Sequence, residues 1–512
     1  MFNFLTGSNL MNSNKLRGVI AAVAGAMMFN AMPAMADSTD DIVNALIAKG
    51  VLTEEEGALL VKGRTGEKEA AAKKKESAIS ASFKDGIVFE SGDKQHKMSI
   101  NGRAQLDYRS FNNEDSTNQA DTFDIRRAYL GVKGTFYNTY DYEVTYNGAN
   151  AAGSDLLYAY FNARYWDAAQ LKLGQFKQPF SMEELGSSRF TNFTERSFVT
   201  QLVPSVDRGI QLHGVPTKGL TYAVGAFNGV GINGGTAAND TFGGNTAAAT
   251  GVTAVPASAS DGKAYTGRVT ANIAEFIGNK DAVFHLGAAY SKSTENSNTS
   301  AIGMRSEGRG TNVFASQAFT ALSSTNKGYD LNRTGLEAAV AYGPFKFQSE
   351  YVKAEFEPDG NTALVTGAVA GQSYDIDAWY AAVNWNITGE SYADVYKDGL
   401  FGGRLKPKSE FSPRDGKYGW GAWEIGARYS KLDASDFAAA QTNRVFITPG
   451  SSANNATKFN EADAITLGLK WIPSPNVRYM LNYVTTDMDC VSGVVCTNDE
   501  EKAINLRAQI DF

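Results

Sequence analysis

The sequence predicts an all-β protein, a 16-stranded antiparallel transmembrane β-barrel preceded by a short N-terminal helical periplasmic segment. Two observations predict this fold class. Apolar and polar residues alternate with a period of two from His96 to Phe512, as in strands with one face in lipid and one in water. In addition, no apolar run beyond the N-terminus is long enough to cross a membrane as a helix.

The first expected strand shows the alternation well. In KMSINGRAQLDYR, residues 97–109, Met98, Ile100 and Leu106 share one face, whereas Arg103 and Asp107 lie on the other. The further segments bring the number of strands to sixteen, an even number that is large enough to enclose an aqueous lumen. These segments are residues 123–136, 140–148, 156–164, 170–176, 209–215, 220–227, 264–273, 283–291, 333–342, 345–355, 375–387, 421–432, 464–471, 477–485 and 503–512.

The connections between these strands alternate in length. Short ones such as residues 137–139 are expected in the periplasm, and long ones such as residues 229–261 outside the cell. The connection at residues 388–420 breaks this rule, because it is long but falls on the periplasmic side. We expect it to fold up into the lumen with the cations Arg404, Lys406 and Lys408; the alternative is that part of it is a strand.

The residues before the barrel have a different character. Residues 1–36 are predicted to be a signal peptide, with Lys15 and Arg17 before a short apolar segment and small residues before Asp37. Residues 37–82 are predicted to be a periplasmic helical or coiled-coil segment and linker, in which Thr53 and Glu56 form a capping box. This segment either drives trimerisation or acts as a solvated tether. The barrel is expected over residues 96–512.

One loop is too long to be a turn. Pro179 ends the strand at residues 170–176, and the residues that follow, up to Ser205, mix aromatic side chains with charges. Loops of this length are functional or disordered. Because this one is rich in Phe, we expect it to pack inside the wide barrel. Its charged residues are Lys177, Glu183, Glu184, Arg189, Glu195 and Arg196.

The two cysteines, Cys490 and Cys496, are close together in the segment CVSGVVC. A disulfide between them is permitted in an exported protein. The alternative, a metal site, would need histidine partners, and none of the three histidines is near in sequence. The sequence therefore predicts a disulfide, no metal and no cofactor.

Several segments resemble the phosphate-selective porin O/P family over roughly residues 96–512. They are FDIRRAYLGVKGTF, LKLGQFKQPFSMEELGSSRFTNFTERS, ITGE and WGAWEIGARYSKLD. The resemblance implies a trimeric outer-membrane channel in which the third external loop, another external loop and a periplasmic turn fold into the lumen. It also implies that anions pass along inward arginines to a constriction of lysine and arginine.

The resemblance makes Lys177 and Arg189 the best candidates for the constriction, with Arg196 next. Arg126 and Arg127 match an arginine pair of the family. Adjacent strand residues face opposite ways, so only Arg127 should line the pore if the strand is regular.

Two further inward cations are predicted. Arg103 faces inward by the alternation of its strand. Arg268 lies in KAYTGRVTANI, where phosphate-specific members carry arginine at successive inward positions, but this segment offers only Lys263 and Arg268. Because the inward positions elsewhere mix both signs of charge, we expect a weak to moderate anion preference.

The predicted function is passive diffusion of small solutes through a water-filled porin, with a preference for anions such as phosphate or polyphosphate. The alternatives are a general or weakly selective porin, and a surface adhesin or receptor barrel. An outer-membrane enzyme is not expected, because His96, His213 and His285 lie in no recognisable acyl-transfer setting.

The expected partners are outer-membrane lipid, small anions and two further copies of the chain in a homotrimer. The terminal strand AINLRAQIDF ends on an aromatic residue and is typical of the signal read by the barrel-assembly machinery of Gram-negative bacteria. Nucleic acid is not expected, because the net charge is −7 and no concentrated basic face is visible.

Overall fold

The computed structural model describes residues 39–62, 78–84, 86–112, 120–149, 155–229, 231, 263–295, 303–315, 319–321, 329–358, 362–364, 373–437, 459–490 and 499–512. The chain forms two compact units, residues 1–78 and residues 79–512. The predicted signal peptide lies outside the described residues.

The first unit contains helix α2 (Thr39–Ala48) and a second helical stretch at residues 54–62. Thr53 and Glu56 cap this second stretch reciprocally. The Thr53 N–H donates to Glu56 Oε2 (2.9 Å), and the Glu56 N–H donates to Thr53 Oγ1 (3.2 Å). The capping box therefore forms as the sequence predicts. None of the described helices combines the length and apolarity needed to cross a bilayer.

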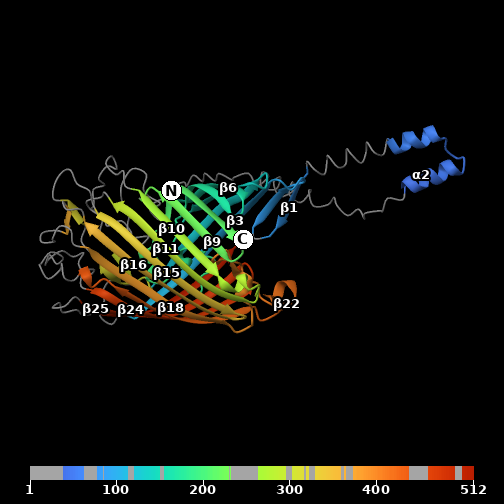
Figure 1. Ribbon diagram of the computed structural model, residues 1–512. Helices are drawn as coiled ribbons and strands as arrows, with labels where there is room; N and C mark the ends of the chain where they lie inside the picture. Colours follow the sequence, from blue (N-terminus) through green and yellow to red (C-terminus); the bar gives the residue numbers. More distant parts are fainter. Residues whose placement is uncertain are drawn as a thin grey trace, which may run out of the picture. The chain divides into compact units, whose positions relative to one another are not determined.

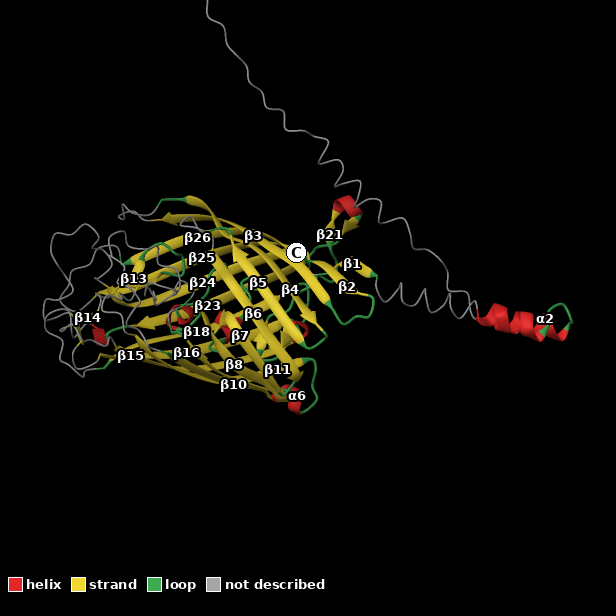
Figure 2. Cartoon of the chain, turned by 90° about the horizontal axis from the view of Figure 1, so that it is seen from above, coloured by secondary structure: helices red, strands yellow, loops and turns green. Residues whose placement is uncertain are grey.

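The second unit is a closed 16-stranded antiparallel barrel, which confirms the predicted fold class (Figures 1 and 2). Each strand pairs with its neighbour in the sequence, and β26 closes the barrel on β3, with Asp511 opposite Arg103. The strands are β3 (Lys97–Asn112), β4 (Thr122–Phe136), β5 (Tyr140–Asn147), β6 (Asp155–Trp166), β7 (Ala169–Lys177), β8 (Val206–Thr217), β9 (Leu220–Phe227), β10 (Ala264–Asn272), β11 (Ala282–Glu295), β15 (Tyr329–Tyr342), β16 (Phe345–Pro358), β18 (Tyr374–Asn386), β23 (Ala422–Asp433), β24 (Phe459–Ser474), β25 (Val477–Cys490) and β26 (Glu500–Asp511).

A hairpin that the sequence analysis missed precedes the barrel. Strands β1 (Ile79–Phe83) and β2 (Ile87–Ser91) pair with each other, and β2 pairs with residues 97–100 of β3. Strand β26 pairs with β3 only from Arg103 onward. Because β4 occupies the other edge of β3, β2 continues the edge on which β26 ends.

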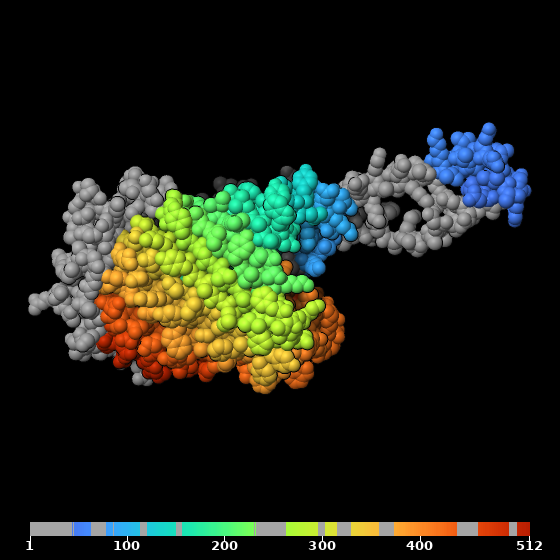
Figure 3. All heavy atoms as spheres, in the orientation of Figure 1, coloured from blue at the N-terminus to red at the C-terminus, as the bar shows by residue number. Residues whose placement is uncertain are grey.

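The outer wall carries the apolar half of the alternation. Leu106, Leu467 and Ile504 are each more than 40% exposed, as expected of side chains that face lipid. Aromatic side chains stack near the periplasmic strand ends, for example Trp423 on Trp471 with ring centroids 5.6 Å apart. On the face shown in Figure 3, the side chains of neighbouring strands form a continuous surface.

The long loop after β7, residues 178–205, lies inside the barrel as expected. It contains the short helices α4 (Met182–Leu185) and α5 (Val199–Leu202). Backbone N–H groups of Met182 and Glu183 donate to the carboxylate of Glu350 on β16 (2.9 and 2.7 Å), and that of Thr194 donates to Asn482 on β25 (2.6 Å). The loop therefore spans the lumen between distant parts of the wall.

Glycines in the wall make room for the aromatic rings of this loop. A Cβ at Gly468 would lie 3.0 Å from Cδ1 of Phe193, and one at Gly426 would lie 3.2 Å from Cζ of the same ring. A Cβ at Gly335 would lie 2.7 Å from Cε1 of Phe180. Both rings are almost fully buried, so these glycines are needed for close approach rather than for an unusual backbone conformation.

The main apolar core also lies inside the barrel. Residues of α5 pack against a hairpin formed by β12 (Gly303–Arg305) and β13 (Asn312–Ala315), and against inward side chains of β15, β16 and β18. Ile376 and Phe356 are inward and fully buried there. Near their extracellular ends these strands are therefore apolar on both faces, because internal loops cover the inner one.

The periplasmic connection at residues 388–420 fulfils its prediction only in part. Tyr396 lies within 2.8 Å of His285 on β11, and Arg404 forms an ion pair with Asp511, so the first half reaches the lumen. Lys406 and Lys408 are exposed instead, because the second half forms its own small hairpin. The remaining short elements are α6 (Ile273–Phe276), β14 (Phe319–Ala321), β17 (Thr362–Leu364), η1 (Ala393–Val395), β19 (Tyr396–Lys397), β20 (Leu400–Phe401), β21 (Phe411–Ser412), η2 (Pro413–Asp415) and β22 (Lys417–Tyr418).

Replacing Gly468 with valine should displace Phe193 and loosen the internal loop. Burying a large apolar side chain stabilises a folded structure by about 1.5–3 kcal/mol. If Phe193 can no longer pack against residue 468, conformations with a displaced loop should become populated. Single-channel recordings should then show larger and noisier currents than the wild type. Gly267→Val is the matched control, because its Cβ would meet no atom closer than 3.6 Å. Identical currents for wild type and Gly468→Val would contradict the proposed role of the contact between Phe193 and Gly468.

Candidate functional site

A cavity of about 390 Å³ lies between the loop at residues 178–205, the β12–β13 hairpin and strands β4, β6 and β7. Six cationic side chains and four carboxylates line it. The cations are Arg126, Arg127, Lys177, Arg196, Arg305 and Arg309, and the carboxylates are Asp124, Glu184, Glu195 and Glu307. The cavity therefore brings together Lys177, Arg196 and Arg127, three of the residues that the sequence singled out, with an excess of positive charge.

Lys177 and Arg196 share one carboxylate. Lys177 Nζ lies 3.3 Å from Glu184 Oε1, and Arg196 Nη1 lies 3.0 Å from Glu184 Oε2. Burial alone would raise the pKa of Glu184, but Arg196 and Lys177 hold that pKa below its usual value. The carboxylate is therefore ionised at neutral pH and is shared by the two basic side chains.

Glu195 is the second anchoring carboxylate. Arg126 Nε lies 2.8 Å from it, Arg507 Nη2 lies 3.2 Å away on β26, and Arg309 Nη1 lies 3.6 Å away on the hairpin. Burial would raise the pKa of Glu195, but the charges of Arg126 and Arg309 hold the pKa well below the usual range. Glu195 thus joins the internal loop, the wall and the hairpin.

The expectation that only Arg127 of the arginine pair lines the pore is wrong. The pairing of β3 with β4 shifts between Gln105 and Leu106, so that Arg126 has no partner opposite it. This β-bulge breaks the alternation and turns both side chains inward. Arg126 then pairs with Glu195, whereas Arg127 Nη1 donates to Gln105 Oε1 (3.0 Å).

Two guanidinium groups of the cavity lack a carboxylate partner. Among the residues that the structure describes, Arg127 and Arg305 have no carboxylate oxygen within 4.0 Å, whereas Arg126, Lys177, Arg196 and Arg309 each have one. Arg127 and Arg305 are therefore the two cations of the cavity that no carboxylate neutralises directly.

Arg103 and Arg189 lie beside the cavity but do not line it. The guanidinium of Arg103 stacks over the ring of Tyr129 at 4.3 Å from its centroid, and Tyr129 does line the cavity. Arg189 Nη2 donates to Asn101 (2.6 Å), and its carbonyl accepts from Gln509 (3.1 Å). These two predicted residues belong to the wall of the lumen next to the site.

Arg268 lies elsewhere. Its Nε is 2.6 Å from Glu337 Oε1, and its Nη2 donates to the carbonyl of Gly399 in the periplasmic connection (3.0 Å). It therefore fastens that connection to the wall, and the structure does not bring it to the cavity. Of the two cysteines, Cys490 ends β25 and Cys496 lies outside the described residues, so the disulfide stays a prediction.

The resemblance implied that a second external loop enters the lumen, but the sequence analysis did not identify the β12–β13 hairpin as that loop. Arg305, Glu307 and Arg309 come from its segment GMRSEGRGT. Glu307 is buried and accepts from Arg428 on β23 (2.6 Å). The sequence feature that could have identified this hairpin is its cluster of charges between glycines, in a loop otherwise rich in Ser, Thr and Asn.

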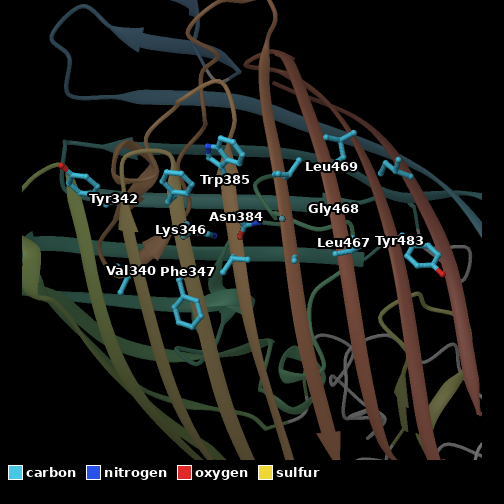
Figure 4. Close-up of a pocket in the computed structure, with 16 residues that line it drawn as sticks. Val340, Tyr342, Lys346, Phe347, Asn384, Trp385, Leu467, Gly468, Leu469 and Tyr483 are labelled. Atoms are coloured by element: carbon cyan, nitrogen blue, oxygen red, sulfur yellow. The ribbon is translucent and has the colours of Figure 1, made fainter.

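A larger hollow of about 840 Å³ lies on the outer wall, across strands β15 to β25 (Figure 4). Most of its lining is apolar and exposed, for example Phe347, Val383 and Leu467. In Figure 4, Tyr342 lies at one side of the hollow and Tyr483 at the other. Because this hollow faces the bilayer, it is not suited to a hydrated solute, in contrast to the charged cavity.

Comparisons with known proteins found similar chains. The chain is 25% identical over 436 residues to Porin O of Pseudomonas aeruginosa, which covers 80% of this chain and 87% of that protein. Among solved structures, an anion-selective porin from Comamonas acidovorans is 12% identical, with a TM-score of 0.47, over 81% of this chain and all of that one. The channel DcaP of Acinetobacter baumannii is 11% identical, with a TM-score of 0.46, over 83% and 99%.

The family model described as "Phosphate-selective porin O and P" matches residues 98–512, which is the whole barrel from the start of β3. This extent agrees with the resemblance found in the sequence. The chain therefore belongs to the phosphate-selective porin O and P family.

Proposed function

We propose that this protein conducts small anions passively across the Gram-negative outer membrane, and that the cavity around Lys177 selects them. Membership in the porin family supports a channel rather than an enzyme. The observation that carries the proposal is the loop at residues 178–205, which narrows the lumen of a closed barrel and lines it with excess positive charge.

The charges have two different roles. Lys177 and Arg196 hold the loop through Glu184, so much of their field is neutralised locally. Arg127 and Arg305 have no such partner and act on a passing ion. A site of this kind attracts an anion without binding it too tightly to leave.

The rest of the lumen supports weak to moderate selectivity. Several inward cations further along the wall are paired, as Arg507 is with Asp107 (2.7 Å) and Lys470 with Glu424 (2.9 Å), whereas Lys172 and Lys346 have no carboxylate oxygen within 4.0 Å among the described residues. Such pairs contribute little net charge to the pathway. The preference for anions therefore depends on a few residues rather than on a continuous ladder of arginines.

The proposal includes the partners expected from the sequence: outer-membrane lipid, a homotrimer and the barrel-assembly machinery. The terminal strand supports the last of these. Phe512 exchanges two backbone hydrogen bonds with Gly102 (2.9 and 3.0 Å), so the final residue completes the closure of the barrel.

Neutralising Arg127 and Arg305 together with glutamine should weaken anion selectivity. A unit charge acts on an ion about 4 Å away with about 1 kcal/mol in water, so losing two should lower the anion-to-cation permeability ratio several-fold. Reversal potentials in a salt gradient across a planar bilayer measure this ratio. Lys292→Gln with Lys353→Gln is the control, because both lysines face outward and pair with aspartates. An unchanged ratio in the Arg127 and Arg305 variant would remove these residues from the selecting site.

Protonation of Glu184 and Glu195 should loosen the internal loop only at low pH. The pKa values of Glu184 and Glu195 are lowered, so their stabilising effect is complete above the unfolded value of about 4.3 and is lost as the pH falls through the folded values. The wild-type reversal potential should therefore change when the pH falls below about 4. Glu195→Gln should show the loosened behaviour already at neutral pH, and wild-type selectivity of this variant at neutral pH would contradict the assignment.

Removing the terminal ring should impair assembly. A Cβ at Gly102 would lie 2.6 Å from Cζ of Phe512, which shows how closely the ring packs on that strand. Phe512→Ala should lower the amount of folded barrel in the outer membrane, measured as the heat-modifiable form on gels. Tyr418→Ala, which removes an exposed ring of the periplasmic connection, should not; equal amounts for both variants would speak against the terminal signal.

A further inference from the structure

We propose that the cavity prefers phosphate monoesters that carry a sugar ring over inorganic phosphate. This inference rests on the proposed function and names the class of solute for the same site. Three features of the cavity carry it: its volume, the tyrosine rings in its wall, and the buried polar atoms that lack partners.

The cavity is larger than an inorganic anion needs. Its volume of about 390 Å³ lies within the range of about 300–1,000 Å³ that is usual for sites that bind small organic molecules. A phosphate ion would fill only a small part of this space. A sugar phosphate would place its phosphoryl group among the cations and still occupy the remaining volume.

Two tyrosine rings form part of the lining, Tyr129 on β4 and Tyr158 on β6. Strand β5 lies between them: Asn147 is opposite Tyr129 and also lines the cavity, and Thr145 is opposite Tyr158. The guanidinium of Arg103 lies over one face of the Tyr129 ring. Such a wall offers flat, partly apolar surfaces of the kind on which a sugar ring packs, whereas an inorganic anion gains nothing from them.

The same arrangement continues toward the periplasm. Tyr160 follows Tyr158 on the inner face of β6, and Lys172 Nζ lies 4.9 Å from the centroid of its ring. A cation therefore lies over an aromatic ring at two places along this wall: Arg103 over Tyr129 and Lys172 over Tyr160. A solute that is both anionic and ring-bearing finds matching groups at both levels.

The charge of the site matches a monoester. Arg127 and Arg305 are the two cations without a carboxylate partner among the described residues, and a phosphate monoester carries about −1.5 to −2 charge at pH 7. Guanidinium groups suit phosphate oxygens, because their N–H groups form a planar fork. The Nε atoms of Arg196 and Arg305 are buried without a hydrogen-bond partner in the described part of the chain, so they are available as donors.

One buried acceptor of the cavity suits a solute that carries hydroxyl groups beside its phosphoryl group. Oε1 of Glu307 is buried and has no hydrogen-bond partner among the described residues, although the Oε2 atom of the same side chain accepts from Arg428 and Thr466. Buried polar atoms are normally paired. A sugar hydroxyl can donate a hydrogen bond to this oxygen while the phosphoryl group of the same molecule stays among the cations.

The test is block of chloride current through single channels of the full-length protein in a planar bilayer. Glucose 6-phosphate should half-block the current at about a tenfold lower concentration than inorganic phosphate, a difference that one or two ring contacts can supply. Sorbitol 6-phosphate, which has the same charge and similar size but no ring, should resemble inorganic phosphate, and uncharged glucose should not block.

Variants of Tyr158 separate the ring contact from size. Tyr158→Ala should abolish the advantage of glucose 6-phosphate, whereas Tyr158→Phe should retain it. Tyr265→Ala, which removes a ring 60% exposed on β10, serves as the control. Equal or stronger block by inorganic phosphate, equal block by sorbitol 6-phosphate, or an advantage that survives Tyr158→Ala would each overturn the inference. A wild-type channel without chloride conductance or anion preference would instead overturn the proposed function itself.

Discussion

The structure depends on ion pairs that join the internal loop to the inner wall of the barrel. A cylinder of sixteen strands is too wide for the side chains of its wall to fill the lumen. In this protein a loop occupies part of that space, and the buried polar groups of the loop need partners. Glu195 illustrates the solution, because it binds Arg126 on β4, Arg507 on β26 and Arg309 on the β12–β13 hairpin. Glu350 does the same for the start of α4. These contacts fix the position of the internal loop, and the loop in turn determines where the cavity and its cations lie.

This organisation separates cations that hold the structure from cations that act on a solute. Lys177 and Arg196 share the carboxylate of Glu184, and Arg428 pairs with Glu307. Counting lysines and arginines inside the barrel therefore overestimates the positive potential along the pathway. The charge that acts on a solute is the remainder after pairing, and Arg127 and Arg305 contribute to it where the loop and the hairpin meet.

The sequence predicted the features that depend on the alternation of side chains within one strand. It did not predict the features that depend on how two distant segments pair with each other. Sixteen strands and an internal loop follow from the alternation of side chains and from a Phe-rich segment after Pro179. The inward turn of Arg126 does not, because a β-bulge is a mismatch between two strands and leaves no mark on one of them. The insertion of the β12–β13 hairpin was missed for a similar reason: its partners, Arg428 and Glu501, lie far away in sequence.

The β1–β2 hairpin limits the register of β26 at the place where the barrel closes. Strand β2 takes residues 97–100 of the same β3 edge that β26 takes from Arg103 onward, so the last strand cannot slide toward the periplasm without displacing it. A shift of one residue in the pairing register would turn the apolar side chains of β26 toward the lumen and its polar side chains toward the lipid. The hairpin therefore helps to keep β26 in the register that points its polar side chains into the lumen.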